Sequence, residues 1–183
     1  LDEPCAERPF LYAGAISHAP LGPAARRSME RYTRALVCEL GLRGVNSLDF
    51  VLHQGQPQVL ELNARPSATL ELYEQSATDG WVKKHVQACL GELPEDLPQR
   101  VAGEVCGHRV CYAKRNVRVP HNVRWPRWAK DLPSAGSRIA SGQPLCSVFA
   151  RACDAAAVEL RLRQRQRQVE RMIARWRTRG AEN

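Results

Sequence analysis

Two short runs of strand-forming residues flank the tripeptide Gln-Gly-Gln at residues 54–56. The runs are GVNSLDFVLH, residues 44–53, and PQVLELNA, residues 57–64. Val, Ile and aromatic residues favour strands, and Gly55 can take the positive φ that a tight turn needs. The spacing therefore predicts an antiparallel β-hairpin. The pairing of its two strands determines which side chains lie opposite each other.

The predicted hairpin carries a row of polar side chains on one face. Side chains alternate between the two faces of a strand, so Glu61, Asn63 and Arg65 share a face. Asp49 on the partner strand could place its carboxylate beside them. Two carboxylates and an amide oxygen suit Mg²⁺ or Mn²⁺, and without a cation the carboxylates would repel each other. The pattern predicts metal binding at Asp49, Glu61 and Asn63 and leaves Arg65 for a phosphate oxygen; the alternative is an edge hairpin with a solvated polar face.

The segments around the hairpin predict a mixed α+β fold. Residues 20–41 begin with Pro, repeat apolar residues at helical spacing and end at Gly41, which predicts a helix. Residues 69–90 predict a helix that is broken at Asp79–Gly80. Short β-type runs follow, separated by Gly and Pro, with residues 124–136 as a loop between them. From Cys153 the pattern is helical again.

These patterns divide the chain into four parts. We expect a first subdomain at residues 1–95, a linker at 96–103, a small β-rich subdomain at 104–152 and a basic C-terminal helix at 153–183. The linker is predicted because residues 91–100 combine two prolines with acidic residues and show no periodicity. The chain starts with Leu in what looks like the middle of a fold, so we also expect a fragment.

Charge and cysteine content restrict the function classes. The net charge is +8, and the excess of basic residues lies in the second half. The Arg-rich C-terminal helix could bind nucleic acid. Its apolar stripe and interspersed Gln instead favour a helix that packs on the protein's own core and leaves its basic face in solvent. The seven cysteines include no Cys-x-x-Cys pair. Cys106 and Cys111 could be metal ligands or a redox pair, and the pattern favours free thiols in a reducing compartment, the cytoplasm.

The polar hairpin resembles the metal-binding end of the ATP-grasp superfamily of ligases, which includes biotin carboxylase. The resemblance rests on Asp49, the Glu-x-Asn-x-Arg-Pro run from Glu61 to Pro66, and the preceding Leu-Gly-Leu-Arg-Gly. It covers roughly residues 10–90. It implies that Asp49, Glu61 and Asn63 bind the Mg²⁺ or Mn²⁺ ions that bridge ATP phosphates, and that Arg65 contacts a phosphate or the substrate.

The resemblance implies an ATP-dependent ligase that joins a carboxylate to an amine through an acyl phosphate. The implied partners are ATP, Mg²⁺ and small carboxylate and amine substrates. No apolar run is long enough to cross a bilayer, so no membrane is expected, and the pattern of the basic helix disfavours nucleic acid. The chain departs from the family because the lysines and Gly-rich loop expected ahead of the hairpin are absent from it. We therefore expect the C-terminal half of an ATP-grasp domain, acting as a homo-oligomer or with its missing N-terminal half. The alternative is a non-catalytic assembly module whose basic half docks nucleic acid or an acidic partner.

Residues 110–150 show a second, weaker resemblance. They are similar to the β-rich extension of predicted ATP-dependent ligases, some of them linked to tetrahydromethanopterin and methanofuran pathways of one-carbon metabolism. Trp125 and Trp128 in this region could stack on a ring-shaped ligand, but aromatic residues beside a proline more often hold a loop against a core.

Overall fold

The computed structural model describes residues 11–77, 79–92 and 103–176, which form two compact units. We call residues 18–77 with 79–92 the hairpin unit, and residues 11–17 with 103–176 the sheet unit. Both combine helices with antiparallel strands, so the predicted α+β class is confirmed. The predicted linker, residues 96–103, lies almost wholly outside the described residues, and the predicted boundaries stay a prediction.

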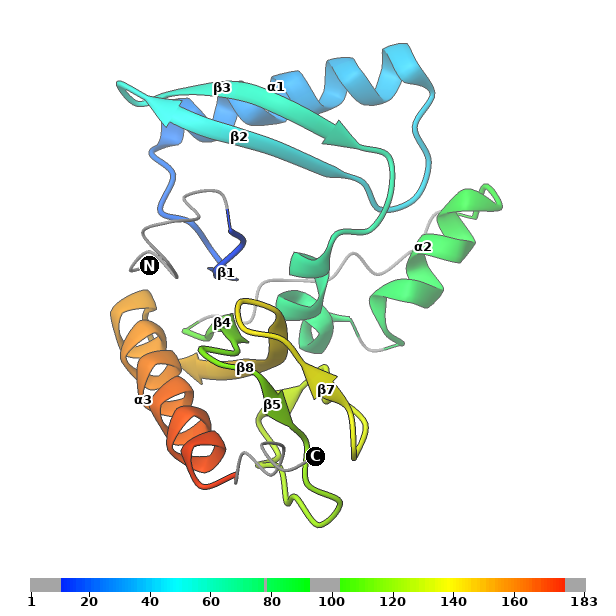
Figure 1. Ribbon diagram of the computed structural model, residues 1–183. Coiled ribbons are helices and arrows are strands. Elements are labelled where there is room, and N and C mark those ends of the chain that lie inside the picture. Colours follow the sequence, from blue (N-terminus) through cyan, green and yellow to red (C-terminus); the bar gives the residue numbers. More distant parts are fainter. Residues whose placement is uncertain (1–10, 78, 93–102, 177–183) are drawn as a thin grey trace. The chain divides into compact units, whose positions relative to one another are not determined.

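The hairpin unit is built on one helix and one two-stranded sheet (Figure 1). Helix α1, Pro23–Leu40, begins with Pro, which suits the first helical turn, and ends where Gly41 takes the left-handed conformation. Strands β2, Ser47–His53, and β3, Gln56–Asn63, pair antiparallel. The predicted helix and hairpin are therefore confirmed.

The segment after the hairpin differs in part from its prediction. Residues 69–78 were expected to be helical, and the structure has the 3₁₀-helix η1 over Ala68–Ser76, followed by α2 over Trp81–Cys89. The break at Gly80 is confirmed, because this glycine has φ 78°. The ends of η1 are closed by bonds to the carbonyl three residues back, from Leu70 N to Ser67 O at 3.0 Å and from Ala77 N to Glu74 O at 3.3 Å, which is the 3₁₀ spacing. The Trp81 indole donates to the Tyr73 carbonyl at 2.8 Å and joins the start of α2 to this segment.

The sheet unit contains a four-stranded antiparallel sheet in the order β1-β4-β8-β6. Its strands are β1, Gly14–Ile16, β4, Val105–Tyr112, β8, Pro144–Ala152, and β6, Ala129–Lys130. A second small sheet pairs β5, Val117–Arg118, with β7, Arg138–Ile139. Strand β6 lies inside the predicted loop 124–136. Two residues are too few to show the alternation of apolar and polar side chains that predicts a strand.

Helix α3, Ala155–Ala174, covers one face of this sheet (Figure 1). Val158, Leu162 and Val169 of α3 are almost fully buried, and they pack against strand residues such as Val148. Gly107 of β4 allows the close approach, since an added Cβ would lie 2.6 Å from Val158 Cγ1. Leu160 of the same helix is apolar, but it is 58% exposed and lies off this buried stripe.

Arg109 is a charged side chain in the interface between β4 and α3. It is 7% exposed, donates from Nη1 to Gln166 Oε1 at 3.1 Å, and pairs through Nη2 with Glu159 Oε1 at 3.4 Å. Glu159 is shared with Arg163, whose Nη2 lies at 3.0 Å. A buried cation is tolerated only when it is paired, so this cluster fixes how α3 lies on the sheet.

The described cysteines are free thiols, as the sequence favoured. Cys106 and Cys111 cannot pair because residues five apart on one strand face opposite sides of the sheet. Cys111 instead lies opposite Cys146 on β8, and both are buried. A hydrogen bond with Cys146, together with burial, raises the pKa of Cys111, so this thiol stays protonated.

Gly107→Ala should destabilise the sheet unit, because the new methyl group would overlap Val158 and force α3 away from β4. Overpacking of this kind costs about 1 to 3 kcal/mol. Chemical denaturation of the variant and the parent checks the expectation, and equal stability of the two would contradict the close packing of α3 on β4.

Asp154 should make the stability of α3 depend on pH. Its side chain accepts a hydrogen bond from Ala157 N at 2.7 Å, which holds the pKa of this carboxyl below its usual range. A lowered pKa means that the stabilisation is present at neutral pH and is lost as the pH falls through the folded-state value. Asp154→Ala should therefore melt at a lower temperature than the parent at pH 7, and the gap should close in acid. Asp154→Asn keeps the capping hydrogen bond without the charge, so its melting temperature should depend less on pH. A difference in melting temperature between Asp154→Ala and the parent that stays the same at every pH would contradict the role given to the Asp154 carboxylate.

Candidate functional site

A two-residue turn fixes the register of the β2–β3 hairpin. Gln54 has φ 49° and Gly55 has φ 76°, the pair of positive φ values that a tight type I′ turn requires. The register then sets Asp49 opposite Glu61 and Ser47 opposite Asn63. A bulge follows, because Phe50 pairs with Val59 and Leu60 is left without a partner in the ladder.

This register brings the predicted metal ligands together. Directly opposite residues have Cβ atoms about 5 Å apart, which is within reach of one shared ion. Asn63 lies two residues beyond Glu61 and so shares its face. Asp49 and Glu61 are exposed and Asn63 is half-buried, so all three can be reached from solvent.

The donor set fits a hard divalent cation. Within the described part of the chain, neither Asp49 nor Glu61 forms an ion pair with a basic side chain. Nor does that part hold a group of three His, Cys, Asp or Glu side chains arranged for a metal. The hairpin offers two carboxylates and one amide oxygen, and Mg²⁺ typically completes such an incomplete set with water and phosphate oxygens.

Arg65 lies in the turn that ends β3. Its backbone N–H donates to the Asn63 carbonyl at 2.8 Å, and its Nη1 donates to the Pro66 carbonyl at 3.2 Å. The guanidinium has five N–H donors, so this contact leaves capacity for an anion. The Ser67 and Thr69 hydroxyls, 2.7 Å apart, follow in the same loop.

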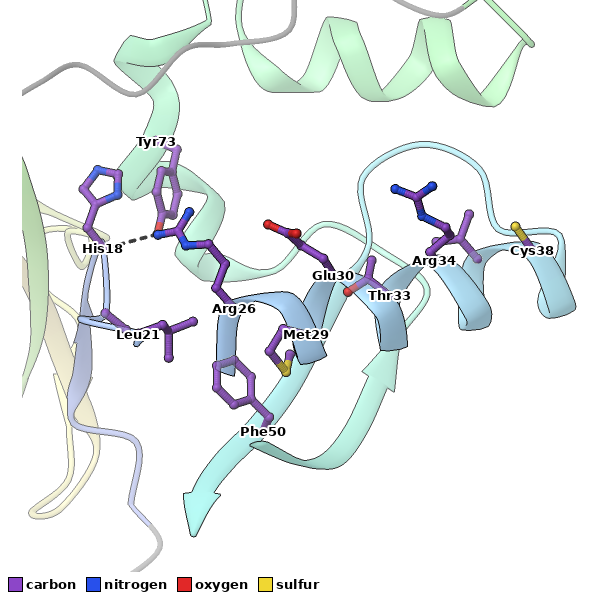
Figure 2. Close-up of a pocket in the computed structure, with 12 residues that line it drawn as sticks. His18, Leu21, Arg26, Met29, Glu30, Thr33, Arg34, Cys38, Phe50 and Tyr73 are labelled. Atoms are coloured by element: carbon purple, nitrogen blue, oxygen red, sulfur yellow. Dashed lines mark hydrogen bonds between the residues drawn. The ribbon is translucent and has the colours of Figure 1, made fainter. Parts of the chain in front are cut away.

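The opposite face of β2 borders a groove that sequence reasoning missed (Figure 2). Phe50 is adjacent to Asp49 and therefore points away from the carboxylate pair. It lines a cavity of about 660 Å³ together with one side of α1, where Met29, Thr33 and Val37 recur every four residues. This spacing is visible in the sequence and could have indicated the groove. A stripe of this kind does not show, however, whether another part of the protein packs against it.

His18 and Tyr73 close one end of the groove. The His18 backbone N–H donates to the Tyr73 hydroxyl at 3.3 Å, and the two rings meet edge to face at 5.3 Å between centroids (Figure 2). His18 has φ 59°, a conformation that is uncommon for a residue other than glycine. His18 was not predicted as a site residue, and it does not share the carboxylate face.

The two tryptophans of the predicted loop pack against protein groups. Trp125 meets Trp176 edge to face at 5.7 Å between ring centroids, and the Arg165 guanidinium lies 5.3 Å from the centroid of Trp128. Both tryptophans border the hydrophobic core of the sheet unit. The interpretation that they hold the loop against a core is confirmed.

Comparison with known proteins identifies the first part of the chain. Residues 3–69 match the family model described as the ATP-grasp domain, and this range includes Asp49, Glu61, Asn63 and Arg65. Residues 3–69 are therefore similar to the ATP-grasp domain. The sequence resemblance is therefore confirmed, and the metal and anion roles of these four residues stay predictions.

Several solved structures share the fold of this chain at low sequence identity. The L-amino acid ligase of Bacillus licheniformis is 16% identical with a TM-score of 0.65, and the match covers 85% of this chain and 43% of that one. N5-carboxyaminoimidazole ribonucleotide synthetase of Thermus thermophilus is 16% identical with a TM-score of 0.58, covering 90% of this chain and 44% of that one.

A third match is the biotin carboxylase domain of the Hydrogenobacter thermophilus 2-oxoglutarate carboxylase, a structure in complex with MgADP, ADP and bicarbonate. It is 16% identical with a TM-score of 0.66, covering 86% of this chain and 38% of that one. The chain thus spans less than half the length of these three structures. The described residues have the fold of part of an ATP-grasp protein, and none of their helices combines the length and apolar character that crossing a membrane requires.

Proposed function

We propose that this chain is part of an ATP-dependent ligase that joins a carboxylate to an amine. The observation that carries the proposal is the register of the hairpin, which sets Asp49 opposite Glu61 with Asn63 on the same face, inside an ATP-grasp segment. A similar fold occurs in proteins named as an amino acid ligase and as carboxylases, one of them with MgADP. The further link to one-carbon metabolism stays a prediction from sequence alone.

In this proposal the hairpin holds the metal and positions phosphate groups. Asp49 and Glu61 contribute the charged oxygens and Asn63 the neutral one. A bound Mg²⁺ would supply positive charge against the phosphates of ATP. Arg65 lies directly after these ligands and would donate hydrogen bonds to an anionic oxygen of the transferring group.

The overall reaction has two balanced steps. A carboxylate oxygen of the substrate attacks the γ-phosphorus of ATP, the bond to the bridging oxygen breaks, and an acyl phosphate and ADP form. The nitrogen of an amine then attacks the acyl carbon, loses a proton and expels inorganic phosphate. Stabilising negative charge on the phosphoryl oxygens is the main requirement of the first step, and that is the role assigned to Arg65 and to the metal ligands.

Metal binding to the 183-residue chain tests the site directly. Mn²⁺, followed by its electron paramagnetic resonance signal, should bind the parent chain and should bind Glu61→Gln at least tenfold more weakly, because one of two anionic ligands is lost. Glu39→Gln, which removes the same charge from exposed α1, is the matched control and should bind like the parent. Equal affinity of Glu61→Gln and Glu39→Gln, or no binding by the parent, would contradict the proposed metal site.

Nucleotide binding tests the functional conclusion. Calorimetric titration with Mg·ATP should show binding that Glu61→Gln removes and Glu39→Gln keeps. Arg65→Gln should keep the Mn²⁺ affinity and weaken Mg·ATP, because Arg65 is assigned to the anion and not to the metal. Loss of Mn²⁺ binding in Arg65→Gln with unchanged Mg·ATP affinity would reverse the two roles and contradict the proposal.

A further inference from the structure

A second cavity lies in the sheet unit, at the C-terminal end of α3. It has a volume of about 350 Å³, between the last turn of α3 and the segment 120–124 that follows β5. Arg124, Asn122 and Arg175 supply its polar lining, and Val123, Met172 and Trp176 supply the apolar part. None of these residues belongs to the predicted metal site, so the cavity is argued independently of the proposed function.

The walls of this cavity are anchored on both sides. Before the segment 120–124, Val119 is 1% exposed; its N–H donates to Ser137 O at 2.9 Å, and its carbonyl accepts from Gly136 N at 2.8 Å. On the other side, Trp176 is 9% exposed and packs edge to face on Trp125. A cavity with fixed walls can bind a ligand without the entropic cost of ordering them.

The polar lining carries positive charge. Within the described residues neither Arg124 nor Arg175 forms an ion pair. Glu170, in the last turns of α3, pairs with Lys114 at 3.0 Å. Two arginines beside one cavity therefore favour an anion.

A helix C-terminus normally disfavours anions because its last carbonyls are exposed. Arg115 offsets this effect at α3. Its Nη2 donates to the carbonyls of Ile173 and Trp176, each at 3.2 Å. Arg115 therefore adds a third guanidinium at this end of α3, and it occupies two of the carbonyl groups there.

We propose that this cavity binds a small organic anion. A carboxylate or phosphate group would lie between Arg124 and Arg175, and Asn122 would donate from its amide. An apolar or aromatic body would contact Met172, Val123 and Trp176. The volume lies at the small end of ligand pockets, which limits the ligand to about the size of one ring with one anionic group.

Titration with phenyl phosphate, followed by the indole N–H resonance of Trp176 in the ¹⁵N-labelled chain, tests this site. The resonance should shift in a saturable way. Arg124→Gln and Arg175→Gln should each weaken binding about tenfold or more, as expected for loss of a charge-assisted hydrogen bond. Arg167→Gln removes the same charge from an exposed position two turns earlier on α3 and should leave the affinity unchanged.

Two further probes define the ligand class. Inorganic phosphate lacks the apolar body and should bind more weakly than phenyl phosphate, and benzoate shows whether the site prefers carboxylate or phosphate. Phenyl phosphate binding that is unchanged in Arg124→Gln and Arg175→Gln, or weakened equally by Arg167→Gln, would overturn the site. So would the absence of a saturable shift in the parent chain. All the substituted arginines are exposed, so the spectra of the variants should otherwise match the parent.

Discussion

The pairing of Asp49 with Glu61 across the hairpin is the constraint on which the candidate site depends. Like charges directly opposite each other destabilise an antiparallel pair. The register is held in spite of this cost by the Gln54–Gly55 turn at one end and by the packing of α1 against β3. A one-residue slip would move Glu61 and Asn63 to the α1 face, so the turn decides whether the ligands meet at all.

The sheet unit also holds a charged group at an energetic cost, in this case the positively charged Arg109. Arg109 is buried where an apolar residue would pack without penalty, and it is accommodated because Glu159 and Gln166 reach it from α3. The same helix must approach β4 closely, and Gly107 makes room for that approach. The orientation of α3 therefore rests on one polar cluster and one missing side chain, and hydrophobic burial supplies the remainder.

Much of the hairpin unit could be predicted because its signals are local. A helix with Pro at its start and Gly at its end, and two strands around a Gly-containing turn, are each specified within a few residues. The alternation of side chains then placed Glu61 and Asn63 on one face. The bulge at Leu60 could not be predicted in this way, because it depends on how the two strands fit each other.

The sheet unit was harder to predict because its pairings join distant residues. Strand β1 pairs with β4, so that Ala15 lies opposite His108, and no local pattern links these segments. The two residues of β6 are held by their pairing with β8. Arg175 looked like one member of a solvated basic helix, and only the path of the segment 120–124 sets Arg124 beside the same cavity. Local patterns therefore predicted the polar face of the hairpin, whereas the second cavity required the tertiary structure.

The sign of the local charge explains why the hairpin face and the cavity at the end of α3 are proposed to bind different ligands. The hairpin gathers two carboxylates without a cation, and its electrostatic cost falls when a divalent ion binds. The end of α3 gathers arginines that form no ion pair within the described residues, and its electrostatic cost falls when an anion binds. In both places the fold maintains an arrangement of like charges that other side chains of the described chain do not neutralise. Binding a ligand of the opposite charge would therefore stabilise the unit concerned as well as serve function.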